Sequence, residues 1–587
     1  MIKAEKNFFK RYLLSPGNWH GTAQAFLAYL IRALKYRTGT AFKPFGFSTR
    51  VRPSWLPPDA IFFEKVHAAT LSTERTFSAE WPDLGVNAAL PEVHRGTPGD
   101  SDIEKEFHFH RWGWLVWKYL HSEISRDKAI AWMLHWIREN SDRKEQIWEP
   151  YSCCERIANL SVIVDPDFAH DALRMKSEKL SGFLFESAVW ILKHLEYYGP
   201  QYTNNHILNN GRALAIAGAL TGERSFLKAG LSILKNMLPT LVSEQGFLRE
   251  RSSHYQLVIL RWILDSEKAL SRHEKTLPPD ELKMIRYYSE RIRKASAQMC
   301  DEDGGLKILI GDVSPDATPE ETCGILQKLH PQWQNISLVD KSDRANDGWF
   351  FIQSEGLEII SQQPKTYPVE YPHHGHADIT SFCLRCGGRG VLIDPGRISY
   401  VDEELSQCFR SGWFHNVPLV DGLSPVSAPF FSNWMPGRYG SAVVHASLDE
   451  PRTLRIEHDG FRRLGKLIHH IRRISIRDSV AEVMDEFAGE GSHEIILCWH
   501  FAPDFNATSV YPGRVRMSSS FCSVNVLTDS PGGTCDFETE FHRTTLMGGW
   551  YSPFYGHAEP SLTMHVKTFR PFPTSISTQF RMEPCAA

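Results

Sequence analysis

The chain has 587 residues, of which 42% are hydrophobic and 23% are charged, and its formal net charge is −4. This length allows roughly two to four domains, at about 100–200 residues for each domain. The composition is that of a globular protein and excludes long stretches of low-complexity disorder. The near-neutral charge gives no support to wholesale binding of nucleic acid or of a membrane surface, so we expect no nucleic-acid partner.

The first part of the chain shows no targeting signal. Residues 1–11 are charged and polar, and they lack the basic start, apolar run and small-residue cleavage site of a signal peptide. The apolar stretch at residues 25–34 is too short to span a bilayer, which takes about 20 residues, so we expect no transmembrane segment. The 11 cysteines are an odd number, which favours a reducing compartment. These features predict a cytoplasmic protein and leave a periplasmic or membrane-peripheral location open.

Hydrophobic periodicity divides the chain into three parts. Pro-rich pieces in residues 1–104 predict an N-terminal extension packed on the main body. Residues 105–340 carry apolar residues at helical spacing, as at 226–241, and predict stacked helical hairpins in an incomplete α/α toroid, although periodicity alone does not show the ring. Residues 348–587 alternate with period two, as at 453–457, and predict an antiparallel β-sandwich. The expected fold class is therefore α+β and multidomain.

Two polar clusters in the helical part contain groups that can handle an acidic substrate. Asn205 and His206 precede a predicted helix, and because an amide donates without carrying charge, the pair can bind a carboxylate. Residues 249–255 bring two Arg, a Glu, a His and a Tyr within seven positions, and a tyrosine beside a cation can act as an acid or a base. Helix capping for the first cluster and a solvated helix start for the second are the structural alternatives.

A histidine-rich cluster lies in the part that is predicted to form strands. On a strand, His374 and His376 would point to the same face of the sheet. With Asp394 from a neighbouring strand and His415 from a loop, His376 can complete a zinc site of His and Asp ligands, while His374 reaches substrate beside it. A chance surface cluster is the alternative, because the chain contains 26 histidines.

Together these motifs resemble the heparinase II/III family of polysaccharide lyases. In family order they are Trp148-Glu149-Pro150-Tyr151 with Arg156-Ile157, Asn204-Asn205-His206, Glu250-Arg251-Ser252-Ser253-His254-Tyr255, His374-Gly375-His376-Ala377-Asp378-Ile379-Thr380-Ser381-Phe382, Asp394-Pro395-Gly396, Phe409-Arg410-Ser411, and His415-Asn416 with Val420-Asp421-Gly422. The resemblance implies an α/α toroid followed by an antiparallel β-sandwich, with the active site between them. It also implies β-elimination on a uronic-acid-containing polysaccharide or oligosaccharide, in which the C5 proton is removed and the C4–O bond breaks.

The resemblance further implies catalytic roles. Asn205, with His206 assisting, would neutralise the carboxylate of the acidic substrate. Tyr255 would be the base or the acid at the scissile bond, and His374 would be its partner. Tyr400, which follows at a spacing that matches less closely, is a second candidate acid.

Three residues match the metal-binding positions of the family, namely His376, Asp394 and His415. We expect a structural Zn²⁺ there, which holds loops in place rather than activating water. Two alternative functions stay open: a metal-dependent glycan hydrolase that uses water on this metal, and a non-catalytic or remodelling protein of cell-surface polysaccharide biosynthesis.

Four further residues are expected to contact the acidic sugar, namely Glu250, Arg251, Arg410 and Trp413. The family often reads Arg-Ser-Thr-Arg-Ala-His-Asn where this chain reads Arg410-Ser411-Gly412-Trp413-Phe414-His415-Asn416, so Trp413 replaces a basic residue. The charge and subsite preference of the substrate are therefore open, and so is the oligomeric state.

Overall fold

The computed structural model describes residues 103–140, 146–165, 178–197, 203–333, 344–354, 356–367, 374–401, 403–426, 442–450, 452–464, 468–530, 537–545 and 547–584. The N-terminal extension that the sequence predicts for residues 1–104 therefore lies outside the described residues, except for its last two positions.

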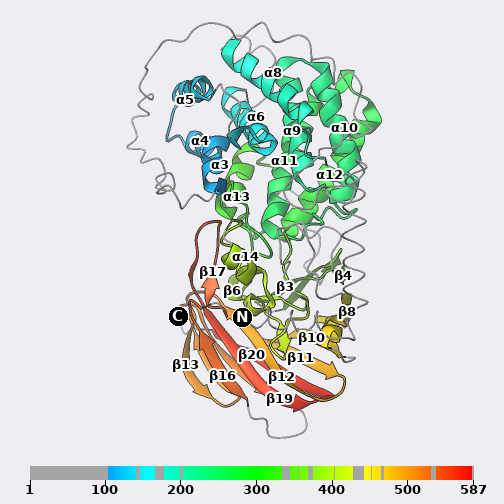
Figure 1. Cartoon of the computed structure of the whole chain (residues 1–587), viewed down its shortest axis with the longest axis vertical. Helices are drawn as coiled ribbons and strands as arrows, with labels where there is room; N and C mark the ends of the chain where they lie inside the picture. Colours follow the sequence, from blue (N-terminus) through cyan, green and yellow to red (C-terminus); the bar gives the residue numbers. More distant parts are fainter. Residues whose placement is uncertain are drawn as a thin grey trace, which may run out of the picture.

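Helices fill the first half of the described chain and gather at one end of the molecule, whereas the strands gather at the other end (Figure 1). The longer helices are α3 (Ile103–Arg111), α4 (Gly113–Leu120), α5 (Arg126–Glu139), α6 (Pro150–Val164), α8 (Glu178–Lys193), α9 (His206–Thr221), α10 (Arg224–Leu241), α11 (Ser253–Ser271), α12 (Pro279–Gln298), α13 (Pro319–Leu329) and α14 (Glu403–Arg410). Among these described helices, no segment combines the length and the apolar composition that a bilayer crossing requires.

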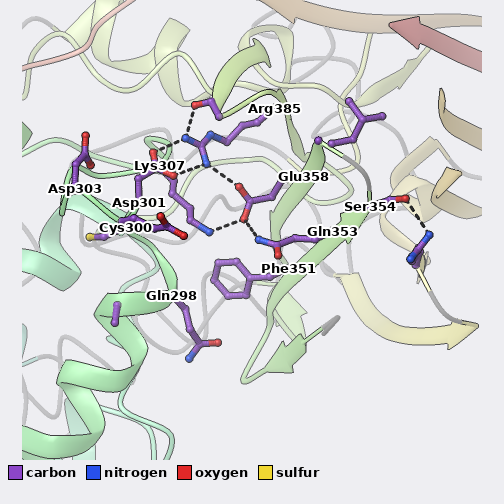
Figure 2. A pocket seen from close by; sticks show the side chains of 16 residues that line it. Gln298, Cys300, Asp301, Asp303, Lys307, Phe351, Gln353, Ser354, Glu358 and Arg385 are labelled. Carbon is purple, nitrogen blue, oxygen red and sulfur yellow. Dashed lines mark hydrogen bonds and ion pairs between the residues drawn. The ribbon is translucent and has the colours of Figure 1, made fainter. Parts of the chain in front are cut away.

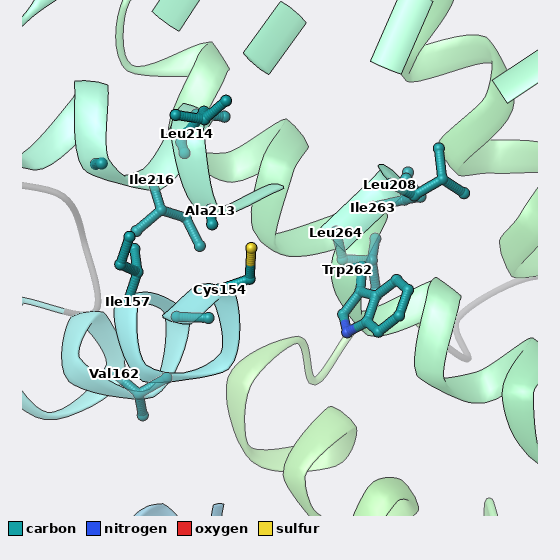
Figure 3. Packing of buried hydrophobic residues seen from close by; sticks show 14 of the residues in the cluster. Cys154, Ile157, Val162, Leu208, Ala213, Leu214, Ile216, Trp262, Ile263 and Leu264 are labelled. Carbon is teal, nitrogen blue, oxygen red and sulfur yellow. The ribbon is translucent and has the colours of Figure 1, made fainter. Parts of the chain in front are cut away.

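Helix α9 forms the centre of the helical part. Its residues from Ile207 to Leu220 are all buried, and it contacts α6, α8, α10 and α11. Figure 3 shows how apolar side chains such as Cys154, Ile216 and Trp262 line the space between these helices. Because α9 is packed on all sides, the residues at its start are held in a fixed position.

A buried ion network ties three of these helices together. Arg212 of α9 is fully buried, and its guanidinium contacts Asp265 of α11 at 2.7 Å and Glu155 of α6 at 2.9 Å. Burying a charge is costly unless it is paired and hydrogen-bonded. The two carboxylates satisfy that requirement and thereby fix the relative positions of α6, α9 and α11.

The second half of the described chain forms two nine-stranded antiparallel sheets and one separate two-stranded sheet. The strands are β1 (Arg344–Asn346), β2 (Trp349–Ser354), β3 (Leu357–Gln362), β4 (Thr366–Tyr367), β5 (Cys383–Cys386), β6 (Arg389–Leu392), β7 (Pro418–Val420), β8 (Ala442–Glu450), β9 (Thr453–His458), β10 (His469–Arg477), β11 (Val480–Ala488), β12 (Ser492–Phe501), β13 (Asn506–Tyr511), β14 (Arg514–Ser518), β15 (Cys522–Asp529), β16 (Glu538–His542), β17 (Trp550–Tyr551), β18 (Glu559–Pro560), β19 (Leu562–Pro571) and β20 (Thr574–Pro584). One sheet has the order β1-β2-β3-β5-β6-β12-β19-β16, with β7 also paired to β12, and the other has the order β13-β14-β15-β20-β11-β10-β9-β8-β4.

The two sheets face each other across one apolar core, as a β-sandwich requires. Burial alternates along the strands: Leu454, Ile456 and His458 of β9 are buried, and the residues between them are partly exposed. The fold class expected from the sequence, helices that form a toroid followed by an antiparallel β-sandwich, is confirmed. The helical part ends with α13 and the β part begins with β1, although helix α14 lies within the β part.

The close approach of α9 and α10 gives a test of this packing. A Cβ atom added to Gly230 of α10 would lie 2.6 Å from the backbone nitrogen of Ala215 in α9. We expect Gly230→Ala to lower the free energy of unfolding by about 1–3 kcal/mol, because the two helices must move apart. The control is Gly182→Ala, on the exposed side of α8 with no atom within 4 Å, which should instead raise stability by about 0.5–1 kcal/mol. Equal effects in chemical denaturation would contradict this packing.

Candidate active site

Four of the five predicted catalytic residues meet between the helical and the β parts. Asn205 lies at the start of α9 and Tyr255 in the first turn of α11, while His374 and Tyr400 come from loops of the β part. The Nδ2 atom of Asn205 lies 3.3 Å from Nε2 of His374, and the ring of Tyr255 stacks on that of His374 at 3.6 Å. The hydroxyl groups of Tyr255 and Tyr400 are 3.1 Å apart.

The prediction that His374 and His376 sit on a strand is wrong. They lie in a loop that precedes β5. The two rings nevertheless reach one acceptor, because His374 Nδ1 lies 3.1 Å and His376 Nε2 2.8 Å from the carboxylate of Asp312. The loop is fixed by its close crossing with Gly311, where φ is +77° and a Cβ atom would lie 2.6 Å from the carbonyl oxygen of His374. Glycine is the residue that tolerates both conditions.

Asp312 is the main site residue that the sequence did not reveal. It is fully buried, and its carboxylate also accepts a hydrogen bond of 2.8 Å from Arg397. Although burial favours the neutral acid, the Arg397 guanidinium and the two histidines hold the pKa of Asp312 well below its usual range. The carboxylate therefore stays charged and links His374 to His376. In the sequence, Asp312 is a single acidic residue after Gly311 and belongs to no motif that could identify it.

His374 is flanked by two carboxylates. In addition to Asp312, the carboxylate of Glu250 lies 3.1 Å from its Nε2 atom, and the same Glu250 accepts a hydrogen bond from the backbone N–H of Asn205 at 2.8 Å. Burial opposes the imidazolium, but the hydrogen bonds to Asp312 and Glu250 outweigh it and raise the pKa of His374. His374 is thus a stronger base than an isolated histidine, and it lies beside the amide group of Asn205.

The two tyrosines form a short chain of hydroxyl groups. Tyr400 donates its hydroxyl proton to the carbonyl oxygen of Val313 at 2.9 Å, and its backbone N–H donates to the hydroxyl of Tyr555 at 2.8 Å. Since the Tyr400 proton is used in this way, the bond between Tyr255 and Tyr400 is donated by Tyr255. Burial raises the pKa of both phenols well above their usual value. Both are therefore protonated at neutral pH, and Tyr255 holds a proton beside His374.

His206 lies at the edge of this cluster. Its side chain is 37% exposed, its Nδ1 atom is 2.8 Å from Glu196, and its ring lies 4.5 Å from that of Tyr151. Partial burial opposes its charge, but the neighbouring Glu196 carboxylate outweighs burial and raises the pKa of His206 to about 9. His206 is therefore a cation at neutral pH, next to Asn205 in the chain. No local pattern in the sequence indicates its pairing with Glu196.

The predicted sugar-contacting residues are spread more widely. Glu250 contacts the cluster directly, because its carboxylate lies beside the imidazole of His374. Arg251 is buried, and its guanidinium binds the side chains of Asp378 and Gln362. The contact with Asp378 helps to fix the 374–378 loop. The carbonyl oxygen of Arg410 accepts a hydrogen bond from the same loop, and Trp413 packs 5.5 Å from the ring of His565 with 8% of its surface exposed. Their contact with substrate stays a prediction.

The three predicted metal ligands do come together. One ligand atom of each of His376, Asp394 and His415 lies within 4.8 Å of the others, and all three residues are buried. In the described part of the structure, Nδ1 of His376 and Nε2 of His415 have no hydrogen-bond partner. The opposite nitrogen of His376 is held by Asp312, which is the arrangement that orients a histidine toward a metal. The residues therefore fit a zinc ion.

A separate cavity of about 780 Å³ lies where α12 meets β2, β3 and β5 (Figure 2). Its charged side chains pair with one another: Glu358 contacts Lys307 at 2.6 Å and Arg385 at 2.7 Å, and Arg385 also contacts Asp301. None of the predicted site residues lines it. Its charges bind the helical part to the first sheet rather than facing the Tyr255–His374 cluster.

The cluster lies where the helical part meets the β-sandwich. Residues 341–582 match the family model "Heparinase II/III-like, C-terminal". Over these residues, less than half of the chain, the sequence is similar to this family, and the resemblance drawn from the sequence is confirmed. A search of curated proteins found no significant match to the sequence.

Solved structures extend the likeness to the whole chain. A crystal structure of heparinase III aligns with a TM-score of 0.63 and 15% identity, over 99% of this chain and 91% of that one. A second heparinase III, with methylated lysines, has a TM-score of 0.57 and 16% identity, over 97% and 92%. A mutant of the heparan sulfate lyase HepC from Pedobacter heparinus has a TM-score of 0.55 and 15% identity, over 84% and 79%. At such identities the likeness establishes the fold.

The His206–Glu196 pair predicts a pH dependence of stability. The pKa of folded His206, about 9, is above its ordinary value of 6.5. The ion pair therefore makes its full contribution to the free energy of unfolding when the pH is below 6.5, and this contribution is lost as the pH rises through about 9. We expect the stability difference between the wild type and Glu196→Gln to shrink over that range in chemical denaturation. His206→Gln should abolish this pH dependence, and a difference that stays constant with pH would contradict the ion pair.

Proposed function

We propose that this chain is a polysaccharide lyase that cleaves a uronic-acid-containing glycan by β-elimination. The observation that carries the proposal is the stack of Tyr255 on His374, with Asn205 at 3.3 Å from the same imidazole. A carboxylate binder, a base and an acid are the three groups that this reaction needs in one place. The fold, shared with heparinase III and heparan sulfate lyase, supports the same class of substrate.

Substrate binding would rest on Asn205 and His206. The amide of Asn205 donates a hydrogen bond to the uronate carboxylate, and the cationic His206 adds positive charge at the edge of the site. Neutralising this carboxylate makes the adjacent C5 proton more acidic, because the negative charge of the enolate-like intermediate is spread onto it.

His374 would act as the base and Tyr255 as the acid. In its neutral form, His374 takes the C5 proton, and the electron pair of the C5–H bond forms the C4–C5 double bond. The C4–O bond breaks, and the leaving oxygen takes the phenolic proton of Tyr255, which Tyr400 orients through their hydrogen bond. Two features support this division: the carboxylates of Asp312 and Glu250 strengthen His374 as a base, and the high pKa of Tyr255 keeps its proton available.

We further propose that His376, Asp394 and His415 hold one zinc ion. When bound, this ion supplies a fixed positive charge and a rigid joint between the 374–378 loop and the segments that carry Asp394 and His415. The carboxylate of Asp312 contacts both His376 and His374. A metal ion that fixes His376 would therefore also help to fix His374, the proposed base.

The acid role of Tyr255 can be tested with a minimal change. Tyr255→Phe removes one hydroxyl group, and we expect it to lower turnover on a uronate-containing glycan at least about a hundredfold while the fold stays intact. Tyr288→Phe is the matched control, because Tyr288 is a buried tyrosine of α12 outside the cluster. The measurement is the rise in ultraviolet absorbance of the unsaturated product. Activity of Tyr255→Phe equal to that of the control would rule out the assignment.

The zinc proposal is tested by His376→Ala. We expect this variant to lose zinc at the His376 site in elemental analysis and to melt at a lower temperature than the wild type, because binding energy at a structural metal site is folding energy. His121→Ala, at an exposed histidine of the helical part, should leave both quantities unchanged. Zinc content unchanged in His376→Ala would show that the three residues do not hold the ion.

A further inference from the structure

A second group of potential metal ligands lies outside the site described above. Glu540 and His542 are two positions apart on β16, so their side chains share one face of the strand, and Glu540 is directly opposite His565 of β19. One ligand atom of each of the three residues lies within 4.8 Å of the others. No compact sequence motif joins the three residues, because His565 lies more than 20 positions after His542.

His565 is the unusual member of this group. Its side chain is fully buried, and in the part of the chain that the structure describes neither ring nitrogen has a hydrogen-bond partner. Buried polar atoms in native proteins almost always have a partner, and an imidazole with neither nitrogen engaged requires an explanation. The Nε2 atom of His542 makes no hydrogen bond among the described residues either, and it lies 3.5 Å from the carboxylate of Glu540.

We propose that Glu540, His542 and His565 form a second metal site, which takes a divalent transition ion such as zinc. Two imidazoles and one carboxylate are a ligand set that suits zinc and leaves a fourth position for water. The ion supplies the missing partner of the buried His565 ring. The ligands come from the edge strand β16 and its neighbour β19, so the ion joins the two strands across the edge of the sheet.

Lys567 competes for Glu540, because its Nζ atom lies 2.5 Å from Oε2. The same Oε2 atom lies 3.5 Å from Nε2 of His542, so Lys567 and the ion would share the carboxylate of Glu540.

The position of the site gives the ion a consequence for the catalytic cluster. The pairing of β16 with β19 ends at His542 and Thr563, and the chain between them makes an excursion that carries β17 and β18. In Figure 1, β17 stands away from the sheet toward α14. The excursion contacts the active site through Tyr555, whose hydroxyl accepts the backbone N–H of Tyr400 at 2.8 Å. A metal ion that joins β16 to β19 would hold the two ends of this connecting segment together. The segment contacts Tyr400 through Tyr555.

The experiment compares metal content in three forms of the full chain. Each is loaded with excess zinc, passed through a desalting column and analysed for zinc per chain. We expect His542→Gln to hold one equivalent fewer than the wild type. The matched control is His469→Gln: His469 of β10 also pairs with a glutamate, Glu457, at 3.0 Å and is 39% exposed, but no third described ligand joins it. It should hold as much zinc as the wild type.

A second variant keeps the proposal testable if His542→Gln does not fold. Glu540→Gln changes a side chain that is 36% exposed, and we expect it to lose the same equivalent after desalting. Repeating the comparison in the His376→Ala background separates the two sites, because the loss caused by His542→Gln must persist there. Equal zinc content in the wild type, His542→Gln and Glu540→Gln would overturn the proposal, whether or not the His376 site binds zinc.

Discussion

The carboxylate of Asp312 is the interaction on which the site depends. It is fully buried, yet it stays charged because Arg397 donates to it and because two histidines approach it from the same loop. A buried charge without such partners would cost several kcal/mol, so these contacts constrain one another. One oxygen faces His374, next to Asn205 and Tyr255, and the other faces His376, next to Asp394 and His415. Displacing Asp312 would disturb the proposed base and the proposed metal site together.

This constraint also explains how the two parts of the molecule cooperate. The helical part supplies Asn205 and Tyr255 at the starts of α9 and α11, which are fixed by the buried core around α9. The β part supplies His374 and Tyr400 from loops, whose positions depend on contacts with Arg251, Gly311 and Tyr555. A catalytic arrangement divided in this way requires that the loops be held firmly. The structure does so with buried charges, a tight glycine crossing and two groups of potential metal ligands.

The sequence predicted regular elements well and the crossing of distant segments poorly. Strand β9 was expected at 453–457 and runs from Thr453 to His458, because a strand buried on one face alternates visibly. The His-x-His motif was placed on a strand, although Gly375 and the crossing at Gly311 make that segment a loop.

The residues of the candidate site were predicted from short motifs in the sequence, whereas their partners were not. Asp312 lies 62 positions before His374, and Tyr555 lies 155 positions after Tyr400. Their contacts arise from the tertiary fold alone, and one sequence contains no local pattern that reports them.

Elimination at a glycosidic bond is distinguished from hydrolysis by the mass and the ultraviolet absorbance of the product. The purified protein is incubated with a panel of uronic-acid polysaccharides and their oligomers, and the new ends are analysed by mass spectrometry and ultraviolet spectroscopy. We expect fragments that carry an unsaturated uronate, absorb in the ultraviolet and are lighter by one water than hydrolysis products. Saturated fragments that contain the added water would contradict elimination and favour a metal-dependent hydrolase.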